Sequence, residues 1–349
     1  MPLAKYVFKP GINKEGTNYS NEGGWFDADK VRFRKGRPER IGGWQKQSTN
    51  SFIGTSRKIY SYRAASGTNY ITLGTHQKFY VLEGQEYADI TPIRNTTSAG
   101  DITFAATNGS STITATDTSH GAVAGDFVTF SGAVSLGGNI TATVLNQEYQ
   151  IDTVPNSDTF TFTATATANS SDTGNGGSSI VGVYQLNSGL DSYVSSTGWG
   201  AGTWGAGTWG STTALSFANQ LRLWSIDNFG DDTVLNPRAG GLFYWDESSG
   251  TGTRAVNVTT KAGASDVPTI ALQTMVSDVD RHVITFGCNP VGSSTLDPLL
   301  VRFSDTESIT DWTPTATNQA GGVQLSMGST IIGALQTRQE ILIWTDAGI

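Results

Sequence analysis

The acidic segment at residues 227–232 carries the side chains best suited to metal chemistry. It reads Asp-Asn-Phe-Gly-Asp-Asp and has some likeness to a calcium-binding loop. Its spacing departs from the Asp-x-Asn-x-Asn-Gly pattern, and no Glu occupies the twelfth position. We therefore interpret this segment as a long turn that Asp and Asn side chains stabilise through hydrogen bonds.

No other group of residues has the spacing of a catalytic or metal site. Asp117, His120 and Asp126 fall in predicted turns without a recognisable ligand motif, so we favour structural roles for them. Glycoside hydrolysis requires two carboxylates flanking the scissile bond, and the sequence singles out no such pair. The chain has three histidines and no Gly-x-Ser-x-Gly, Gly-x-x-x-x-Gly-Lys or His-Glu-x-x-His motif. We predict a protein that is not an enzyme and uses no metal or cofactor.

A Trp-Gly repeat occupies residues 198–210. Trp199, Trp204 and Trp209 recur every five residues, an odd spacing that alternates faces in a single strand. The indole rings could stack on a carbohydrate or contact a partner. Alternatively, each Trp anchors a turn while the glycines allow close backbone packing. We favour the structural interpretation, with a subunit contact as the next.

Composition indicates an all-β protein. Gly accounts for 42 of 349 residues, and Ser and Thr are abundant, which favours short strands and tight turns. No segment longer than about two turns has the apolar spacing of an amphipathic helix. The single cysteine, Cys288, excludes an intramolecular disulfide and lies in a strand-like run, so we expect a buried structural thiol. Without a signal-type leader or a run of about 18 apolar residues, we expect a soluble protein with no stable membrane insertion.

Charge is distributed unevenly along the chain. Residues 1–63 hold 13 Lys and Arg against five Asp and Glu, whereas the whole chain has a net charge of −8. Between Arg94 and Arg222 there is no Lys or Arg, but there are eight acidic residues. Such asymmetry predicts surfaces that face different partners.

The basic N-terminal segment contains a predicted hairpin at residues 29–44. Arg32 and Arg34 alternate with apolar residues, and Arg37 lies in the expected turn at residues 35–38. These three arginines are interaction candidates for nucleic acid or a neighbouring subunit. Basic side chains that protect a solvated edge strand explain the pattern equally well.

The strand pattern predicts propeller-like blades interrupted by an insert. Four short strand candidates follow one another within about 30 residues, the size of one propeller blade. A Thr- and Gly-rich segment that reads as a small β-barrel or sandwich then intervenes. Because a propeller closes on itself, we expect the C-terminal part of a longer protein to be missing. The predicted ranges are 1–58 for the basic arm and hairpin, 59–94 for the first blade, 95–214 for the insert with the Trp-Gly repeat, and 215–349 for further blades.

Several phrases of the sequence resemble the tail nozzle, or tail-hub, proteins of short-tailed bacteriophages. The likeness covers most of the chain, and the phrases are specific only when taken together. They are residues 10–15 (PGINKE), 22–25 (EGGW), 30–34 (KVRFR), 41–44 (IGGW), 73–75 (LGT), 89–94 (DITPIR), 223–230 (LWSIDNFG), 280–282 (DRH), 301–305 (VRFSD) and 343–346 (IWTD).

This resemblance implies a non-enzymatic virion component of the tail that is assembled in the host cytoplasm. It implies a homo-hexamer with a β-propeller, placed around a channel through which genomic DNA passes without sequence-specific binding. The implied partners are the portal-adaptor ring and tail fibres or spikes. The competing hypothesis is a carbohydrate-binding or depolymerising tail protein, and a cellular propeller scaffold is a further alternative.

Overall fold

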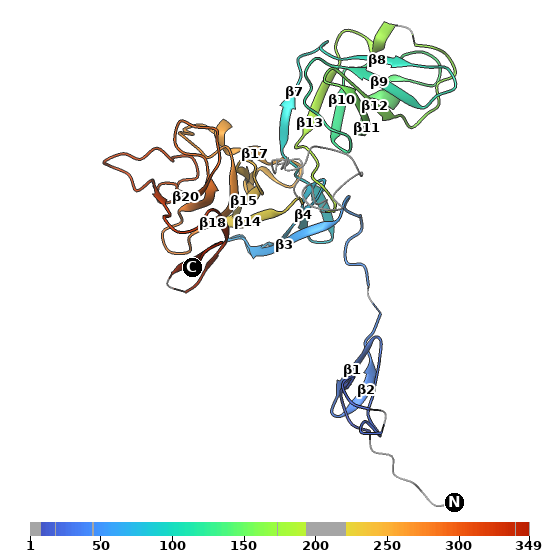
Figure 1. The fold of residues 1–349 in the computed structure, drawn as a ribbon. Helices are drawn as coiled ribbons and strands as arrows, with labels where there is room; N and C mark the ends of the chain where they lie inside the picture. Colours follow the sequence, from blue (N-terminus) through green and yellow to red (C-terminus); the bar gives the residue numbers. More distant parts are fainter. Residues whose placement is uncertain are drawn as a thin grey trace, which may run out of the picture. The chain divides into compact units, whose positions relative to one another are not determined.

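The computed structural model describes residues 8–17, 19–43, 45–172, 174–192, 221–338 and 340–348 (Figure 1). Two compact units are present, Met1–Thr49 and Asn50–Ile349. The described residues form strands almost throughout, with one short α-helix and three 3-10 turns. The prediction of an all-β protein is confirmed.

The first unit contains a two-stranded hairpin of β1 (Val31–Arg34) and β2 (Arg37–Arg40). The turn consists of Lys35 and Gly36, whose φ angles are 51° and 77°. Positive φ at both central residues is the geometry that two-residue hairpins prefer, because its twist matches that of the strands. The expected turn was too long, since Arg37 and Pro38 belong to β2 and pair with Arg34 and Phe33.

The second unit contains three four-stranded antiparallel sheets, each a simple meander of consecutive strands. These are the propeller-like blades that the sequence predicts. Blade 1 comprises β3 (Ser56–Arg63), β4 (Asn69–Thr75), β5 (Phe79–Glu83) and β6 (Glu86–Asp89); blade 2 comprises β14 (Trp224–Phe229), β15 (Asp232–Pro237), β16 (Phe243–Trp245) and β17 (Val256–Asn257); blade 3 comprises β18 (Ala271–Val276), β19 (Val283–Cys288), β20 (Asp297–Phe303) and β21 (Gly321–Gln324).

A two-stranded sheet of β22 (Ile331–Gln336) and β23 (Ile341–Thr345) follows blade 3. The first strands of successive sheets are neighbours in space: β3 contacts β14, β14 contacts β18, and β18 contacts β22. Three apolar clusters fill the spaces between consecutive sheets, with Trp224, Trp312 and Phe286 among their largest members. Burial between sheet faces therefore holds the blades in sequence order.

The insert between blades 1 and 2 is one curled sheet of seven strands, in the order β7-β13-β10-β11-β12-β9-β8. The pairing of β11 with β12 is irregular between Ile151 and Asn156. Such irregularities help the sheet to curl, because bulges increase local twist and curvature. The concave side encloses a separate core that includes Phe104, Phe130 and Phe162. The elements are β7 (Ile93–Thr96), β8 (Thr103–Ala106), β9 (Thr112–Thr116), β10 (Phe127–Ser131), α1 (Ala142–Leu145), β11 (Glu148–Asn156), β12 (Thr159–Thr163) and β13 (Val181–Gln185).

Candidate functional site

The β1–β2 hairpin presents a basic face. Arg32 pairs across the ladder with Glu39, and Arg34 pairs with Arg37, so these four side chains share one side of the hairpin. The Nε atom of Arg32 lies 3.2 Å from a carboxylate oxygen of Glu39. Arg34 and Arg37 are exposed, and no described carboxylate lies within 4 Å of either. Two directly opposed guanidinium groups repel each other, and together they suit an external carboxylate or phosphate.

Trp199, Trp204 and Trp209 lie outside the described residues. Their assignment as anchors of turns, subunit contacts or a carbohydrate platform stays a prediction.

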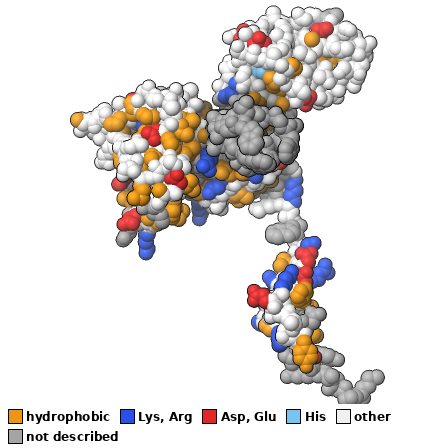
Figure 2. All heavy atoms as spheres, viewed as in Figure 1, with side chains coloured by type: hydrophobic (Ala, Val, Ile, Leu, Met, Phe, Trp, Pro, Cys, Tyr) orange, Lys and Arg blue, Asp and Glu red, His pale blue; other side chains and the backbone are white. Residues whose placement is uncertain are grey.

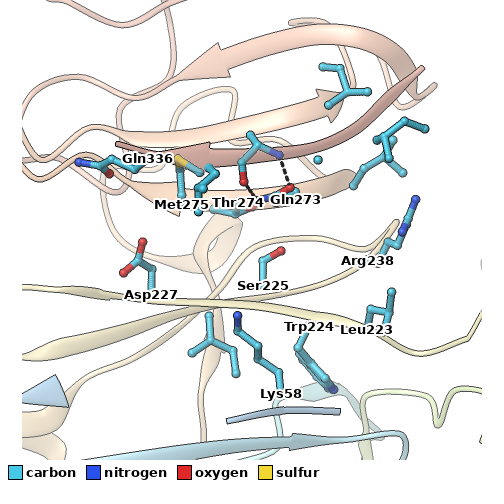
Figure 3. Close-up of a pocket in the computed structure, with 17 residues that line it drawn as sticks. Lys58, Leu223, Trp224, Ser225, Asp227, Arg238, Gln273, Thr274, Met275 and Gln336 are labelled. Atoms are coloured by element: carbon cyan, nitrogen blue, oxygen red, sulfur yellow. Dashed lines mark hydrogen bonds between the residues drawn. The ribbon is translucent and has the colours of Figure 1, made fainter. Parts of the chain in front are cut away.

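A cleft of about 400 Å³ lies between the first strands β3, β14, β18 and β22 (Figure 3). Its wall combines apolar side chains with a few polar ones, among them Lys58, Arg238 and Thr274. Gln273 reaches across from β18 to β22. Its amide group donates to the carbonyl of Ala334 at 2.7 Å and accepts from the amide of Ala334 at 2.8 Å, as the dashed lines in Figure 3 show. These two hydrogen bonds hold β22 against blade 3. One is donated and one is accepted, as in the pairing of two neighbouring strands.

Asp227 links three blades beside this cleft. Its Oδ1 accepts a 2.9 Å hydrogen bond from the hydroxyl of Tyr60 on β3. Its Oδ2 accepts from the amide of Val276 on β18, also at 2.9 Å. Burial raises the pKa of Asp227, although the hydrogen bonds from Val276, Tyr60 and Asn228 oppose that shift.

The remaining carboxylates of the acidic segment also have hydrogen-bond partners. Gly230 and Asp231 form the turn between β14 and β15, and Gly230 has a φ angle of 68°. Asp231 accepts from the amide of Ala65 in blade 1 at 2.7 Å, and Asp232 accepts from the amide of Glu247 at 2.9 Å. The expected turn was too long, since Asp227 and Asn228 belong to β14 and Asp232 belongs to β15. The Asp side chains bond to neighbouring segments of the blades rather than within the turn. Asp227, Asp231 and Asp232 therefore each accept at least one hydrogen bond from a backbone amide.

Asp117, His120 and Asp126 have structural partners in the insert. Asp117 accepts a 2.6 Å hydrogen bond from the hydroxyl of Tyr184. His120 accepts from the amide of Ala122 at 3.0 Å, with its ring packed on aromatic neighbours. Asp126 accepts from backbone amides at residues 123 and 188. Their hydrogen bonds agree with the structural roles that we favoured.

A charge cluster around the buried Lys78 joins the insert to blades 1 and 2. Lys78, which is 3% exposed at its side chain, pairs with Asp89 at 2.8 Å and with Glu148 of the insert. Arg254 pairs with the same two carboxylates, at 2.8 Å and 3.5 Å. Burial raises the pKa of Asp89, but the charges of Lys78 and Arg254 outweigh it and hold that pKa below its ordinary value.

Sequence reasoning missed this cluster. Lys78 and Glu148 are 70 positions apart, and each occurs singly in an ordinary strand pattern. The only available signal was that Lys78 opens a run of apolar residues with no acidic residue beside it.

Neither a metal site nor a membrane-spanning helix is found among the described residues. No three His, Cys, Asp or Glu side chains gather closely enough there to hold a metal ion. Within the same ranges, no helix has the length and apolar character needed to cross a membrane.

The fold and its surfaces define the protein as an all-β chain with propeller-like blades and a curled-sheet insert. No protein-family model matches the chain, and no curated protein matches it. Among solved structures it is similar to a phage phi92 endosialidase, with 14% sequence identity and a TM-score of 0.26. The likeness covers 88% of this chain and 43% of the endosialidase chain. This chain therefore spans less than half the length of that protein, and a TM-score this low carries no functional inference.

Proposed function

We propose that this protein is a structural component of a phage tail, a homo-hexameric nozzle or hub in the virion. In this role it extends the portal-adaptor channel, retains and then conducts DNA during ejection, and supports tail fibres or spikes. It acts without catalysing a reaction.

The observation that carries the proposal is a contact between blades 1 and 2. It is formed by two of the sequence phrases that resemble nozzle proteins. In the phrase at residues 73–75, Gly74 faces the indole of Trp224, which belongs to the phrase at residues 223–230. A Cβ atom on Gly74 would lie 2.5 Å from that ring. Trp224 also donates a 2.7 Å hydrogen bond to the carbonyl of Thr75. These phrases thus form one interlocking contact of the propeller, which supports the use of the resemblance as a likeness of architecture.

Other nozzle-like phrases also lie at structural contacts. Arg302, in the phrase at residues 301–305, is buried and donates to the carbonyls of Asn289 and Asp266 at 3.1 and 2.6 Å. Asp346, in the phrase at residues 343–346, accepts from the amide of Ser329 at 2.6 Å. These two phrases therefore lie at contacts of blade 3 and of the β22–β23 sheet.

The insert supplies the proposed mechanism for DNA passage. Its sequence has no Lys or Arg after Arg94, and the visible face of β8–β12 in Figure 2 shows acidic and uncharged side chains. Asp101 and Asp152 are exposed, whereas Asp117 and Asp126 are buried. If this surface lines the channel, the lack of cations lets DNA slide past, because each Lys or Arg contact with a phosphate adds affinity that must be broken. A hexamer structure with the insert far from the axis would contradict this mechanism.

Electron microscopy of the purified full chain, combined with its mass in solution, tests the nozzle. We expect a hollow six-fold ring that also binds isolated portal-adaptor particles. A compact monomer that fails to join those particles would overturn the proposal.

The same preparation tests the carbohydrate-binding or depolymerising tail protein. Release of reducing sugars from host-surface glycans, or glycan binding lost in Trp204→Ala, would favour that function. Asp231→Asn serves as a second variant, because Asp231 is the carboxylate at the tip of the acidic turn.

A further inference from the structure

We infer that the basic arm, residues 1–49, docks on the acidic body, residues 50–349, of a second copy of this chain. The contact uses the Arg34–Arg37 face of the hairpin together with the apolar side chains of the arm. The inference rests on the proposed function, since it names the surface through which the ring assembles.

The arm lacks a core of its own. Among its described residues, no hydrophobic side chain is buried, and Ala64 is the first buried hydrophobic residue in the part of the chain that the structure describes. Trp25 and Phe33 are half-buried against each other, with ring centroids 6.3 Å apart. Phe8, Tyr19 and Phe26 are more than half exposed. A lone two-stranded hairpin is marginally stable in water, and a segment of about 40 residues seldom buries enough surface to fold alone. The arm therefore requires a partner surface.

Charge identifies the chemistry of that partner. The arm holds ten Lys and Arg against five Asp and Glu, a net charge of +5, whereas the body holds 12 against 25, a net charge of −13. Lys and Arg side chains are visible along the arm in Figure 2. The body displays exposed carboxylates with no described Lys or Arg within 4 Å: Glu83, Glu86, Asp101, Asp152, Asp278, Asp280, Glu307 and Glu340. The two parts of the chain are complementary in charge.

A protein surface fits the arm better than a nucleic acid does. Contacts with the phosphates of duplex DNA would satisfy Arg34 and Arg37 but would leave the aromatic side chains in water, because the base faces of a duplex are already stacked. A protein partner buries both kinds of side chain, with apolar groups at the centre of the contact and charges at its rim. When the arm of one copy contacts the body of the next, the interface is heterologous, the type that generates closed rings.

The test compares self-association of the full chain with that of two charge-reversal variants. Arg34→Glu/Arg37→Glu changes the proposed contact, and Arg281→Glu/Arg338→Glu makes the same change of charge at two exposed sites of the body outside the cleft. Sedimentation measured over protein concentration and salt should show self-association of the wild type that weakens as salt screens the charges. We expect a dissociation constant roughly tenfold higher for the arm variant, and one no higher than the wild-type value for the body variant, because the added negative charge does not reduce the attraction to the basic arm.

Cross-linking of a mixture of ¹⁴N- and ¹⁵N-labelled full chains then identifies the partner. A carbodiimide should join Lys30 or Lys35 to carboxylates of the body, in peptide pairs of mixed label. Links confined to a single copy would overturn the inference, as would a wild type that stays monomeric at low salt. Binding of duplex DNA is measured for the wild type and the arm variant. The inference would also be overturned if the arm variant lost duplex-DNA binding but self-associated like the wild type. Six-fold rings that persist in the arm variant would refute this contact and leave the nozzle proposal intact.

Discussion

The hydroxyl of Tyr60 and the carboxylate of Asp227, 167 positions apart in the chain, lie 2.9 Å apart and connect blade 1 to blade 2. The other oxygen of Asp227 accepts from blade 3, so one side chain joins three blades at their first strands. A half-buried carboxylate with several donors fixes the relative position of those strands, because each donor would lose its partner if a blade moved. The segment that most resembled a cation site is thus part of the framework that joins the propeller-like blades.

Asp227 should give the protein an unusual dependence of stability on pH. Its pKa is raised in the folded state, so its contribution to stability is present in full below the unfolded pKa and is lost as pH rises through the folded pKa. We expect the free energy of unfolding of the wild type to increase relative to Asp227→Asn as pH falls from 7 towards 4. Urea unfolding across this range measures the difference. Glu86→Gln, at an exposed site, is the control, and a difference that stays constant or shrinks as pH falls would contradict the prediction.

Asp89 should show the opposite dependence. Its pKa is lowered in the folded state, so it stabilises the protein above its unfolded pKa, and this contribution is lost as pH falls through the folded pKa. We expect Asp89→Asn to lower the free energy of unfolding by about 3 kcal/mol at neutral pH, since Lys78 stays buried with one carboxylate fewer. The deficit should shrink below pH 4. Acid titrations of both proteins, followed by tryptophan fluorescence, provide the measurement; an equal deficit at pH 3 and pH 7 would count against it.

Gly74→Ala tests the contact between blades 1 and 2. The added Cβ would overlap the Trp224 ring, to which it would lie 2.5 Å away, and the ring is buried beside Phe79. We expect a loss of about 2 kcal/mol of unfolding free energy and a weaker near-UV signal, because an overpacked contact must separate. Gly252→Ala is the matched control, since its Cβ would meet no heavy atom within 4 Å. Equal stability of the two variants would show that the blades do not pack in this way.

Cys288 should behave as a protected thiol. Its side chain is fully buried, and burial raises its pKa, which lowers the fraction of reactive thiolate. We expect Ellman's reagent to label the native protein only as fast as the protein unfolds, and to label it at once in denaturant. Rapid labelling in native buffer at neutral pH would contradict this expectation.

The strands themselves could be predicted from sequence because the signals for them are local. Alternating apolar residues at 112–116, 126–130, 148–154 and 159–164 predict four strands of the insert. The structure has β9 with these bounds, and β10, β11 and β12 to within two residues at each end. The turn at Gly230 was predictable for the same reason, since positive φ at the tip of a tight hairpin favours glycine. The hairpin at Lys35–Gly36 was placed correctly, although its turn is shorter than expected.

The sequence by itself thus determined the all-β class, the excess of Lys and Arg in residues 1–63 and their absence between Arg94 and Arg222. Only the tertiary structure decided which strands lie beside one another at the cleft, that Asp227 joins three blades, and that Lys78 meets Glu148. Strand and turn formation depends on side chains a few positions apart, which a sequence displays directly. Contacts between residues that are 70 or 167 positions apart depend on how the blades pack and which apolar faces they bury. A single Lys, Asp or Glu in the sequence does not indicate which distant residue it will contact.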